Sequence, residues 1–288
     1  MALIELTLDG KHDKVKTAIQ RIKMFDPIAN GWSDKPYYVA YSGGKDSDAL
    51  RILYELSGVQ YELVHNLTTV DAPETVRYVR SIPGVRINKP AESMWQLIIR
   101  NGMPPTRLVR YCCAALKERG GQGRYVATGV RWAESARRKR QRGIAEVLTT
   151  KKSDNLILMQ DNADNRRLME VCQLRGKRIV NPIVDWTDAD VWELLRYYGC
   201  QSNPLYACGY KRVGCIGCPM STRQREGLER YPKYRDMYIR TFGLMIARRQ
   251  ADGKVITWST GQECYDWWVG PASGREADGQ QYFWEEKA

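Results

Sequence analysis

Short apolar runs alternate with helix-like stretches between residues 37 and 198, and this alternation most constrains the fold. The apolar runs are typical of buried strands, and the stretches between them have the spacing of helices. Strands that alternate with helices favour parallel pairing, so the pattern predicts a doubly wound, mostly parallel α/β sheet. The predicted strands are 37–41, 61–66, 85–87, 125–128 and 179–184, and the predicted helices are 46–57, 73–81, 92–101 and 188–198.

A turn rich in glycine and serine, YSGGKDSDAL at residues 41–50, joins the first strand to the first helix. Ligands of such sheets bind at the carboxyl ends of strands, and glycines let backbone N–H groups approach a phosphate. The serines add hydroxyl donors, and the helix directs its positive end at the anion. Lys45 supplies a mobile charge, while Asp46 either organises Mg²⁺ or caps the helix. The predicted phosphate site comprises Ser42, Gly43, Gly44, Lys45, Asp46 and Ser47.

Three segments are predicted around this pattern. Residues 1–35 contain an N-terminal helix, 11–26, and a turn-rich connector from Pro27 to Pro36. Residues 36–200 form the nucleotide-binding α/β domain. Residues 201–288 form a mainly helical subdomain rich in cysteine and aromatic residues.

The charge balance, 45 Lys+Arg against 33 Asp+Glu, gives +12 and favours anionic partners over a merely soluble surface. No stretch reaches the roughly 20 apolar residues of a membrane span, and the N-terminus lacks the features of a signal peptide. We therefore expect a cytoplasmic protein without a membrane partner. Its eight cysteines are then expected to stay reduced, so clustered ones indicate metal or thiol chemistry.

The turn resembles the PP-loop, the SGGxDS signature of ATP pyrophosphatases and sulfonucleotide reductases. Three further stretches are similar to segments of the same superfamily: residues 66–74, residues 128–138 (TGVRWAESARR), and residues 181–210. The resemblance runs from about residue 36 to 235 and implies an adenine-nucleotide-binding fold related to phosphoadenylyl-sulfate reductases. It implies further nucleotide contacts at Thr69, Gly129, Arg131, Ser135 and Arg138.

Two pairs of cysteines, Cys112-Cys113 and Cys215-Cys218, lie in the words RYCCAALK and GCIGC. They resemble the RxCCxxLK and GCxxC words of reductases that hold a four-iron four-sulfur (4Fe-4S) cluster. A CxxC pair alone serves zinc, redox and cluster sites alike, but a vicinal pair favours a cluster. Zinc and unmetallated thiols remain alternatives, and Cys208 is a substitute ligand.

The resemblance leaves two enzymatic functions open. The first is an ATP pyrophosphatase that activates nucleic acid, in DNA phosphorothioation or tRNA thiolation, with Asp46, Lys45 and Arg131 in catalysis. Basic residues at 137–142 and 223–249, interleaved with aromatic ones in the second stretch, favour it. The second is a thioredoxin-dependent reductase of adenylyl sulfate (APS) or phosphoadenylyl sulfate (PAPS). That reductase needs a mobile thiolate, for which Cys264 is the candidate.

A third alternative is a non-catalytic nucleic-acid-binding module, which the intact loop disfavours. The expected cofactors are a 4Fe-4S cluster, ATP (or APS or PAPS) and Mg²⁺. The expected partners are an adenine nucleotide, DNA or tRNA, a cysteine desulfurase or thioredoxin, and a second copy of the chain as a homodimer.

Overall fold

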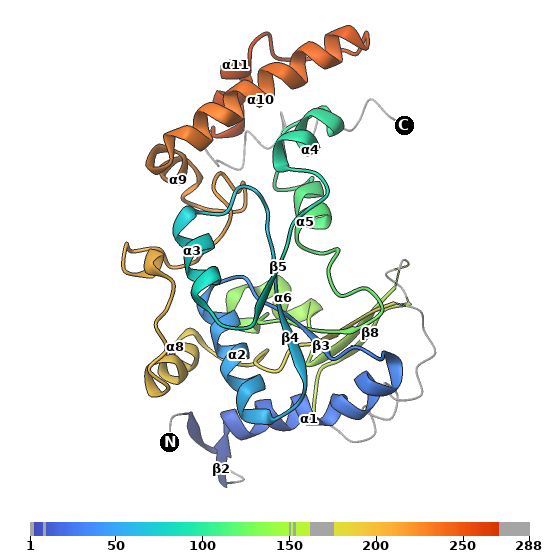
Figure 1. Ribbon diagram of the computed structural model, residues 1–288, viewed down its shortest axis with the longest axis vertical. Helices are drawn as coiled ribbons and strands as arrows, with labels where there is room; N and C mark the ends of the chain where they lie inside the picture. Colours follow the sequence, from blue (N-terminus) through green and yellow to red (C-terminus); the bar gives the residue numbers. More distant parts are fainter. Residues whose placement is uncertain (1–2, 8–9, 150, 152–153, 162–175, 271–288) are drawn as a thin grey trace. The chain divides into compact units, whose positions relative to one another are not determined.

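The computed structural model describes residues 3–7, 10–149, 151, 154–161 and 176–270 (Figure 1). The chain divides into two compact units, and each unit is made of segments that are not contiguous in sequence. Unit 1 contains Met1–Leu67, Asp71–Pro90 and Leu116–Val213. Unit 2 contains Thr68–Val70, Ala91–Ala115 and the chain from Gly214 onward. The predicted segment boundaries at residues 35 and 200 stay a prediction.

Unit 1 is built on a seven-stranded sheet with the order β5-β4-β3-β6-β9-β7-β8. The pairs from β5 to β9 are parallel, whereas β7 runs antiparallel to both of its neighbours. The predicted fold class, a doubly wound and mostly parallel sheet, is thereby confirmed. The strands are β3 (Tyr37–Ala40), β4 (Tyr61–Asn66), β5 (Val85–Asn88), β6 (Tyr125–Ala127), β7 (Ala145–Leu148), β8 (Leu156–Leu158) and β9 (Lys177–Val180).

The strand order reverses at β3. From β3 the chain moves outward to β4 and β5, then returns to the other side of β3 to form β6. In open α/β sheets, the loops at such a reversal diverge and leave room for a ligand at the carboxyl ends of the strands. The glycine-rich turn follows β3 and therefore lies at this point.

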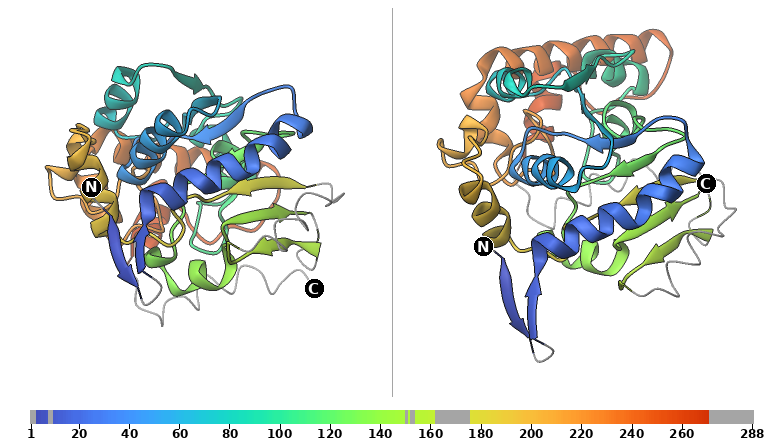
Figure 2. Two further views of the ribbon diagram at one scale, coloured as in Figure 1. Left: turned by 90° about the horizontal axis from the view of Figure 1, so that it is seen from below. Right: turned by 60° about the horizontal axis from the view of Figure 1, so that its bottom comes forward.

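Three helices of unit 1 pack in its main core: α1 (Lys14–Trp32), α2 (Lys45–Ser57) and α8 (Asp188–Tyr197). Figure 2 shows α1 lying across the sheet. Apolar side chains of these helices, such as Ile22, Leu50 and Leu194, are fully buried with Val39 of β3. Burial of this kind contributes roughly 1.5–3 kcal/mol per large apolar side chain. A further helix, α3 (Pro73–Ser81), follows β4 and coincides with its predicted range.

The N-terminal helix differs from its prediction because it continues through Pro27 to Trp32. A proline inside a helix removes one hydrogen bond and disfavours the turn before it. Phe25 and Ala29 flank the proline and are both buried in the main core. Burial of the helical turns on both sides of Pro27 offsets the free-energy cost of the proline. The connector between α1 and β3 is therefore shorter than the predicted range from Pro27 to Pro36.

The structure also differs from prediction at an N-terminal hairpin and at the end of β9. A hairpin of β1 (Ile4–Thr7) and β2 (Gly10–Asp13) precedes α1 and forms a separate two-stranded sheet. The predicted strand 179–184 is also displaced: β9 ends at Val180, and Val184 N donates to Asn181 O in a turn. Apolar residues 183 and 184 are nevertheless buried, which explains why the run was mistaken for strand.

Unit 2 is helical in its described part. Aromatic side chains of α10 and α11 pack together, with Tyr238 and Trp268 ring centroids 4.6 Å apart. The predicted helical character of residues 223–250 and of the TGQECYDWW segment agrees with this arrangement. Residues 271–288, the end of the predicted subdomain, lie outside the described residues. The helices are α4 (Met94–Asn101), α5 (Tyr111–Leu116, ending at the unit boundary), α9 (Gln224–Arg230), α10 (Pro232–Ala251) and α11 (Gly261–Trp268).

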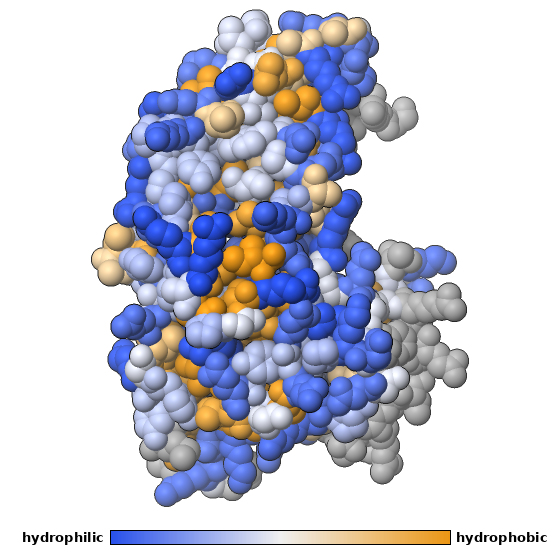
Figure 3. Space-filling model, in the orientation of Figure 1, coloured by the Kyte–Doolittle hydropathy of each residue, from blue (hydrophilic) through white to orange (hydrophobic). Residues whose placement is uncertain are grey.

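Hydrophilic side chains cover much of the face in Figure 3, as a chain with 27% charged residues leads one to expect. Among the described helices, none combines the length and the hydropathy that a bilayer crossing requires.

Candidate nucleotide-binding site

The turn between β3 and α2 requires glycine at position 43. Gly43 has φ +73°, and a Cβ there would lie 2.8 Å from Val79 Cγ2, closer than real contacts allow. The Gly43 carbonyl accepts a hydrogen bond of 2.9 Å from Asn203 Nδ2. Asn203 is 1% exposed, so this hydrogen bond is shielded from water and helps to hold the turn in place. The loop is therefore held in one shape before any ligand arrives.

Hydroxyl groups satisfy the N–H donors at the start of α2. Gly44 N donates to Ser47 Oγ at 3.2 Å, and Ser47 Oγ donates to Gly44 O at 2.7 Å. Lys45 N donates to Tyr206 Oη at 2.9 Å. Tyr206 belongs to η3 (Pro204–Tyr206). A helix N-terminus attracts negative charge, so these hydroxyl oxygens stand where phosphate oxygens would be favoured.

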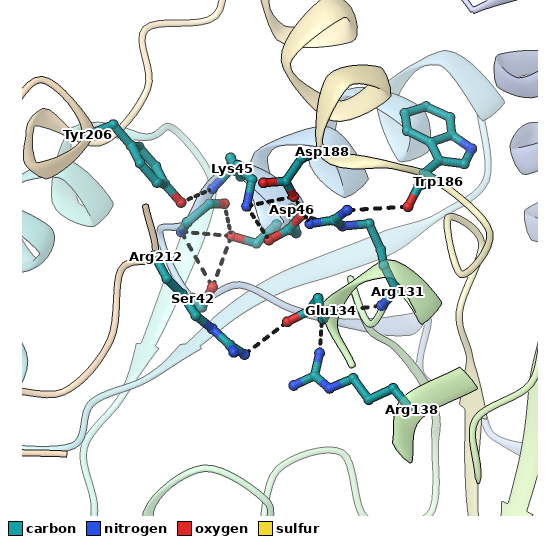
Figure 4. Close-up of polar contacts among 12 residues, drawn as sticks. Ser42, Lys45, Asp46, Arg131, Glu134, Arg138, Trp186, Asp188, Tyr206 and Arg212 are labelled. Carbon is teal, nitrogen blue, oxygen red and sulfur yellow. Dashed lines mark hydrogen bonds and ion pairs between the residues drawn. The ribbon is translucent and has the colours of Figure 1, made fainter. Parts of the chain in front are cut away.

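Two cations and two carboxylates meet beside the loop (Figure 4). Arg131 Nε donates to Asp46 Oδ1 at 2.7 Å, and Arg131 Nη2 pairs with Asp188 Oδ1. Lys45 Nζ lies 3.4 Å from Asp46 Oδ2 and 3.5 Å from Asp188 Oδ1. The Lys45 and Arg131 side chains are 5% and 1% exposed, so both charges are largely removed from water. Close anionic partners are needed to offset the free-energy cost of removing these two cations from water.

The pKa values follow from these contacts. Burial lowers the pKa of Arg131, but attraction to Asp46 and Asp188 outweighs it and leaves the pKa above its ordinary value. Burial raises the pKa of Asp188, but the contacts with Arg131 and Lys45 lower it by more. The pKa of Asp188 therefore lies below its ordinary value, and the carboxyl is ionised at neutral pH. The four groups thus neutralise one another in the nucleotide-free protein.

The segment after β6 brings Arg131 to the loop. A Cβ at Gly129 would lie 3.0 Å from the Asp46 carbonyl oxygen, so glycine allows this backbone to touch α2. Beyond it come η1 (Trp132–Glu134) and α6 (Ala136–Gln141). Ser135 caps α6 by accepting from Arg138 N, and the Arg138 side chain pairs with Glu134. The Ser135 hydroxyl therefore has a structural role in addition to the predicted ligand role.

Unit 1 thus brings together most of the predicted site residues, and it adds partners that the sequence did not single out. Asp188 was interpreted only as an acidic residue of a helix first turn, and it does hold that position. Three of these partners lie inside or next to the family-like segments: Glu134, Tyr206 and Arg212. Their positions in the sequence did not indicate which side chains they contact. The residues brought together are Ser42, Gly43, Gly44, Lys45, Asp46, Ser47, Gly129, Arg131, Ser135 and Arg138.

The predicted adenine contact and cluster ligands belong to unit 2. Thr69 has φ +65° and accepts a hydrogen bond from Met94 N at 2.9 Å. Among the residues that the structure describes, no group of three or more His, Cys, Asp or Glu side chains is placed to hold a metal ion. Cys208, the substitute ligand, is exposed and belongs to unit 1. The four predicted ligands in unit 2 are Cys112, Cys113, Cys215 and Cys218.

These four thiols nevertheless influence one another. The pKa of Cys112 is raised by a hydrogen bond with Cys113, by burial, and by the charges of Cys113, Cys215 and Cys218. Arg110 Nη2 lies 3.3 Å from Cys113 Sγ, and Cys215 Sγ lies 3.5 Å from Thr68 Oγ1. The two cysteine pairs, about a hundred residues apart in sequence, are therefore neighbours in unit 2.

Cys264, the predicted thiolate, lies within α11 and is completely buried. Burial, together with the charge of Glu263, raises the pKa of its thiol well above the usual range. A nucleophilic cysteine needs a lowered pKa and access to substrate. The described environment does not favour that role.

A mostly parallel sheet with a glycine- and serine-rich loop at its switch point, and with cations around the following helix, is typical of α/β proteins that bind phosphate-containing ligands. The model of the phosphoadenosine phosphosulfate reductase domain matches residues 36–221. Since this is well over half of the chain, the protein belongs to that family.

Curated relatives match over limited stretches. An adenosine 5′-phosphosulfate reductase of Burkholderia cepacia is 43% identical over 54 residues, 19% of this chain and 22% of the relative. An uncharacterised protein of Methanocaldococcus jannaschii, MJ0066, is 27% identical over 199 residues, 64% of this chain and 36% of the relative. The chain thus spans well under half the length of these relatives.

Solved structures resemble the chain at low sequence identity. A phosphoadenylyl-sulfate reductase of Candida auris in a phosphate complex is 18% identical, with a TM-score of 0.42, covering 74% of this chain and 97% of that one. An FMN adenylyltransferase of Candida glabrata is 13% identical, with a TM-score of 0.44, covering 71% and 61%.

Proposed function

We propose that the protein is an ATP pyrophosphatase that activates a nucleic acid for sulfur transfer. The observation that carries the proposal is the convergence of Lys45 and Arg131 on Asp46 at the amino end of α2. Preorganised cations beside a phosphate loop stabilise the charge that develops when a phosphoanhydride bond breaks. The loop between β3 and α2, the net charge of +12 and the family together support an adenine nucleotide as the ligand.

In the proposed reaction, an oxygen of the nucleic acid attacks the α-phosphorus of ATP. The bond between the α-phosphorus and its bridging oxygen to the β-phosphate breaks, and pyrophosphate leaves. The product is a nucleic acid that carries AMP on the attacked oxygen, and a sulfur nucleophile later displaces AMP. Lys45 and Arg131 would leave their carboxylate partners to bind the phosphates, because phosphate carries more charge than a carboxylate.

A carboxylate suits Mg²⁺ as a ligand, and Asp46 is the residue of the loop that offers one. Mg²⁺ bound there with the nucleotide would neutralise phosphate charge. Asp46 would then exchange its contact with Arg131 for the metal, which leaves the guanidinium for a phosphate oxygen.

A 4Fe-4S cluster on Cys112, Cys113, Cys215 and Cys218 is a further part of the proposal. It is supported by the gathering of both pairs in unit 2 and by the softness of thiolate ligands. The described thiols are not arranged as a group that could hold a metal ion, so the cluster is the part of the proposal that the geometry supports least.

A second candidate function is reduction of adenylyl sulfate or phosphoadenylyl sulfate to sulfite and AMP, or adenosine 3′,5′-bisphosphate, with two electrons from a dithiol such as thioredoxin. The family and the names of its curated relatives favour it. The buried thiol of Cys264 counts against it, because the attacking thiolate would first have to be exposed.

One experiment separates the two. Anaerobically purified protein is assayed for pyrophosphate release from ATP, with and without DNA or tRNA, and for sulfite release from both sulfonucleotides with thioredoxin. Pyrophosphate release that nucleic acid stimulates is expected. Sulfite release that disappears in Cys264→Ser would instead establish the reductase.

Asp46→Asn tests the role of the loop. We expect turnover to fall by at least about 100-fold, because the variant loses the carboxylate for Mg²⁺ and leaves Arg131 with Asp188 as its remaining carboxylate partner. The circular dichroism spectrum should be unchanged. Asp34→Asn, the same substitution at an exposed position outside the loop, is the control and should keep full turnover. Equal activity of the two variants would refute the assignment.

A further inference from the structure

The outer face of α10 in unit 2 alternates cations with apolar side chains. The opposite face of this 20-residue helix (Figure 1) is buried, with Tyr238, Phe242 and Met245 each at most 1% exposed. Residues three or four apart share one face of a helix, and five exposed residues follow that spacing. We call these five residues the α10 stripe: Lys233, Met237, Arg240, Leu244 and Arg248.

The three cations of the α10 stripe are not neutralised by the protein. Within the described residues, none of them has an ion pair or a side-chain hydrogen bond. The acids on and just after the helix are matched by other cations, since Asp236 pairs with Arg235 at 2.9 Å and Asp252 with Lys254 at 3.2 Å. The stripe therefore carries an excess of positive charge that is open to solvent.

Apolar side chains separate the cations. Met237 and Leu244 are 40% and 51% exposed, and each lies between two cations along the helix. At a rise of 1.5 Å per residue, successive cations are roughly 10 to 12 Å apart along the axis. A ligand that matches the stripe must carry negative charge at repeated intervals and apolar surface between those charges. Single-stranded nucleic acid has both, because its phosphates repeat along the backbone and the faces of its bases are exposed.

Two other occupants fit the α10 stripe less well. A second copy of the chain, related by a twofold axis, would place the same positive face against itself, and like charges at an interface repel. A membrane-surface helix inserts its apolar face into the lipid and keeps its cations on the other face. The apolar face of α10 is already buried within unit 2, and its cations alternate with apolar residues on the outer face.

We propose that the α10 stripe binds a single-stranded segment of nucleic acid. Phosphate oxygens contact the three cations, and bases lie against Met237 and Leu244. The side chains of the stripe are exposed, so the segment binds without any rearrangement of the unit 2 core. The inference rests on the proposed function and deepens it, because it assigns the surface that holds the nucleic acid.

The test measures the binding of a fluorescein-labelled single-stranded oligonucleotide by fluorescence anisotropy, without ATP and at several salt concentrations. The double variant Arg240→Gln/Arg248→Gln should bind about tenfold more weakly. The slope of log affinity against log salt should fall by about 1.4, because each phosphate contact with a single strand contributes roughly 0.7.

Two further variants separate the stripe from general charge. Lys16→Gln/Lys23→Gln removes two exposed cations, seven residues apart, from α1 of unit 1 and is the matched control. It changes the net charge equally and should alter affinity by less than about twofold. Leu244→Ser should weaken binding by about threefold and leave the salt slope unchanged, because it removes apolar contact and no charge.

Equal losses in the two double variants, or full affinity in Arg240→Gln/Arg248→Gln, would overturn the proposal. A duplex of the same sequence that binds as tightly, with the same dependence on the stripe, would refute the single-strand assignment. A chain dimer that dissociates in Leu244→Ser, with no oligonucleotide bound by the wild type, would assign the stripe to a second copy.

The binding assay is independent of turnover, so the two proposals can fail separately. If nucleic acid does not stimulate pyrophosphate release but the oligonucleotide still depends on the stripe, the proposed function fails and the surface stands. If Arg240→Gln/Arg248→Gln keeps both full affinity and full stimulation, the proposed function stands and the surface assignment fails.

Discussion

At the scale of single residues, the candidate site is a set of charges that neutralise one another. Asp188 is the least buried member, and it contacts both Lys45 and Arg131. A phosphate group must compete with this carboxylate for the same two cations. A nucleotide that bound here would have to displace Asp188 from Lys45 and Arg131, and the free energy of these contacts would reduce its affinity.

Asp188→Asn is expected to bind pyrophosphate about two- to fivefold more tightly, because an exposed ion pair is worth at most about 1 kcal/mol. Isothermal titration with pyrophosphate measures this. Glu193→Gln removes an exposed charge from the same helix away from the loop and serves as the control. Weaker binding in Asp188→Asn would mean that the carboxylate supports the anion site and does not compete with it.

At the scale of elements, α2 is tied to β3 by a buried polar contact. Asp48, fully buried on α2, accepts a hydrogen bond from Tyr41 Oη, which follows β3 directly. Burial raises the pKa of Asp48 to about 6, although the hydroxyls of Tyr41 and Tyr78 oppose this. The folded state therefore binds a proton at Asp48 more tightly than the unfolded chain, whose ordinary value is 3.8.

A raised carboxyl pKa destabilises the folded state as pH rises from about 4 to about 6, and the loss is then constant. For this shift it is on the order of 3 kcal/mol. Asp48→Asn should lack this decline, so the difference in unfolding free energy between variant and wild type should grow over that interval. Urea unfolding at several pH values measures it, with Asp34→Asn as control. A constant difference would contradict the raised pKa.

At the scale of the whole molecule, the predicted chemistry is divided between two compact units. The phosphate loop and its arginines belong to unit 1, while the four cysteines belong to unit 2. Each unit is assembled from segments that the other interrupts in sequence.

The proposed 4Fe-4S cluster predicts that anaerobically purified protein is brown and that Cys215→Ser abolishes this colour, because a cubane cluster loses stability with one of its four thiolates. Iron analysis should fall from about four atoms per chain towards zero. Cys200→Ser, in unit 1, is the control and should keep both colour and iron. An unchanged visible spectrum in Cys215→Ser would reject this residue as a ligand.

Local patterns predicted the central elements well. The strand 61–66 and the helix 73–81 have the predicted limits, since apolar spacing and a proline in the first turn are local signals. β7 and β8 were missed because β7 is placed by pairing with β9, a contact between distant segments, and β8 is placed by pairing with β7. The course of α1 through Pro27 depends likewise on the core that it covers.

Local sequence signals were enough to predict the turn between β3 and α2. A strand, two glycines and a helix start are contiguous, and Gly43 needs its φ of +73° whatever surrounds it. The charges that face this turn depend instead on contacts between segments that are distant in sequence. Arg131 lies 85 residues from Asp46 and 57 from Asp188 in the chain, and Arg212 meets Glu134 from another segment. Contacts over such separations arise from how the strands are ordered in the sheet, and no local spacing encodes them.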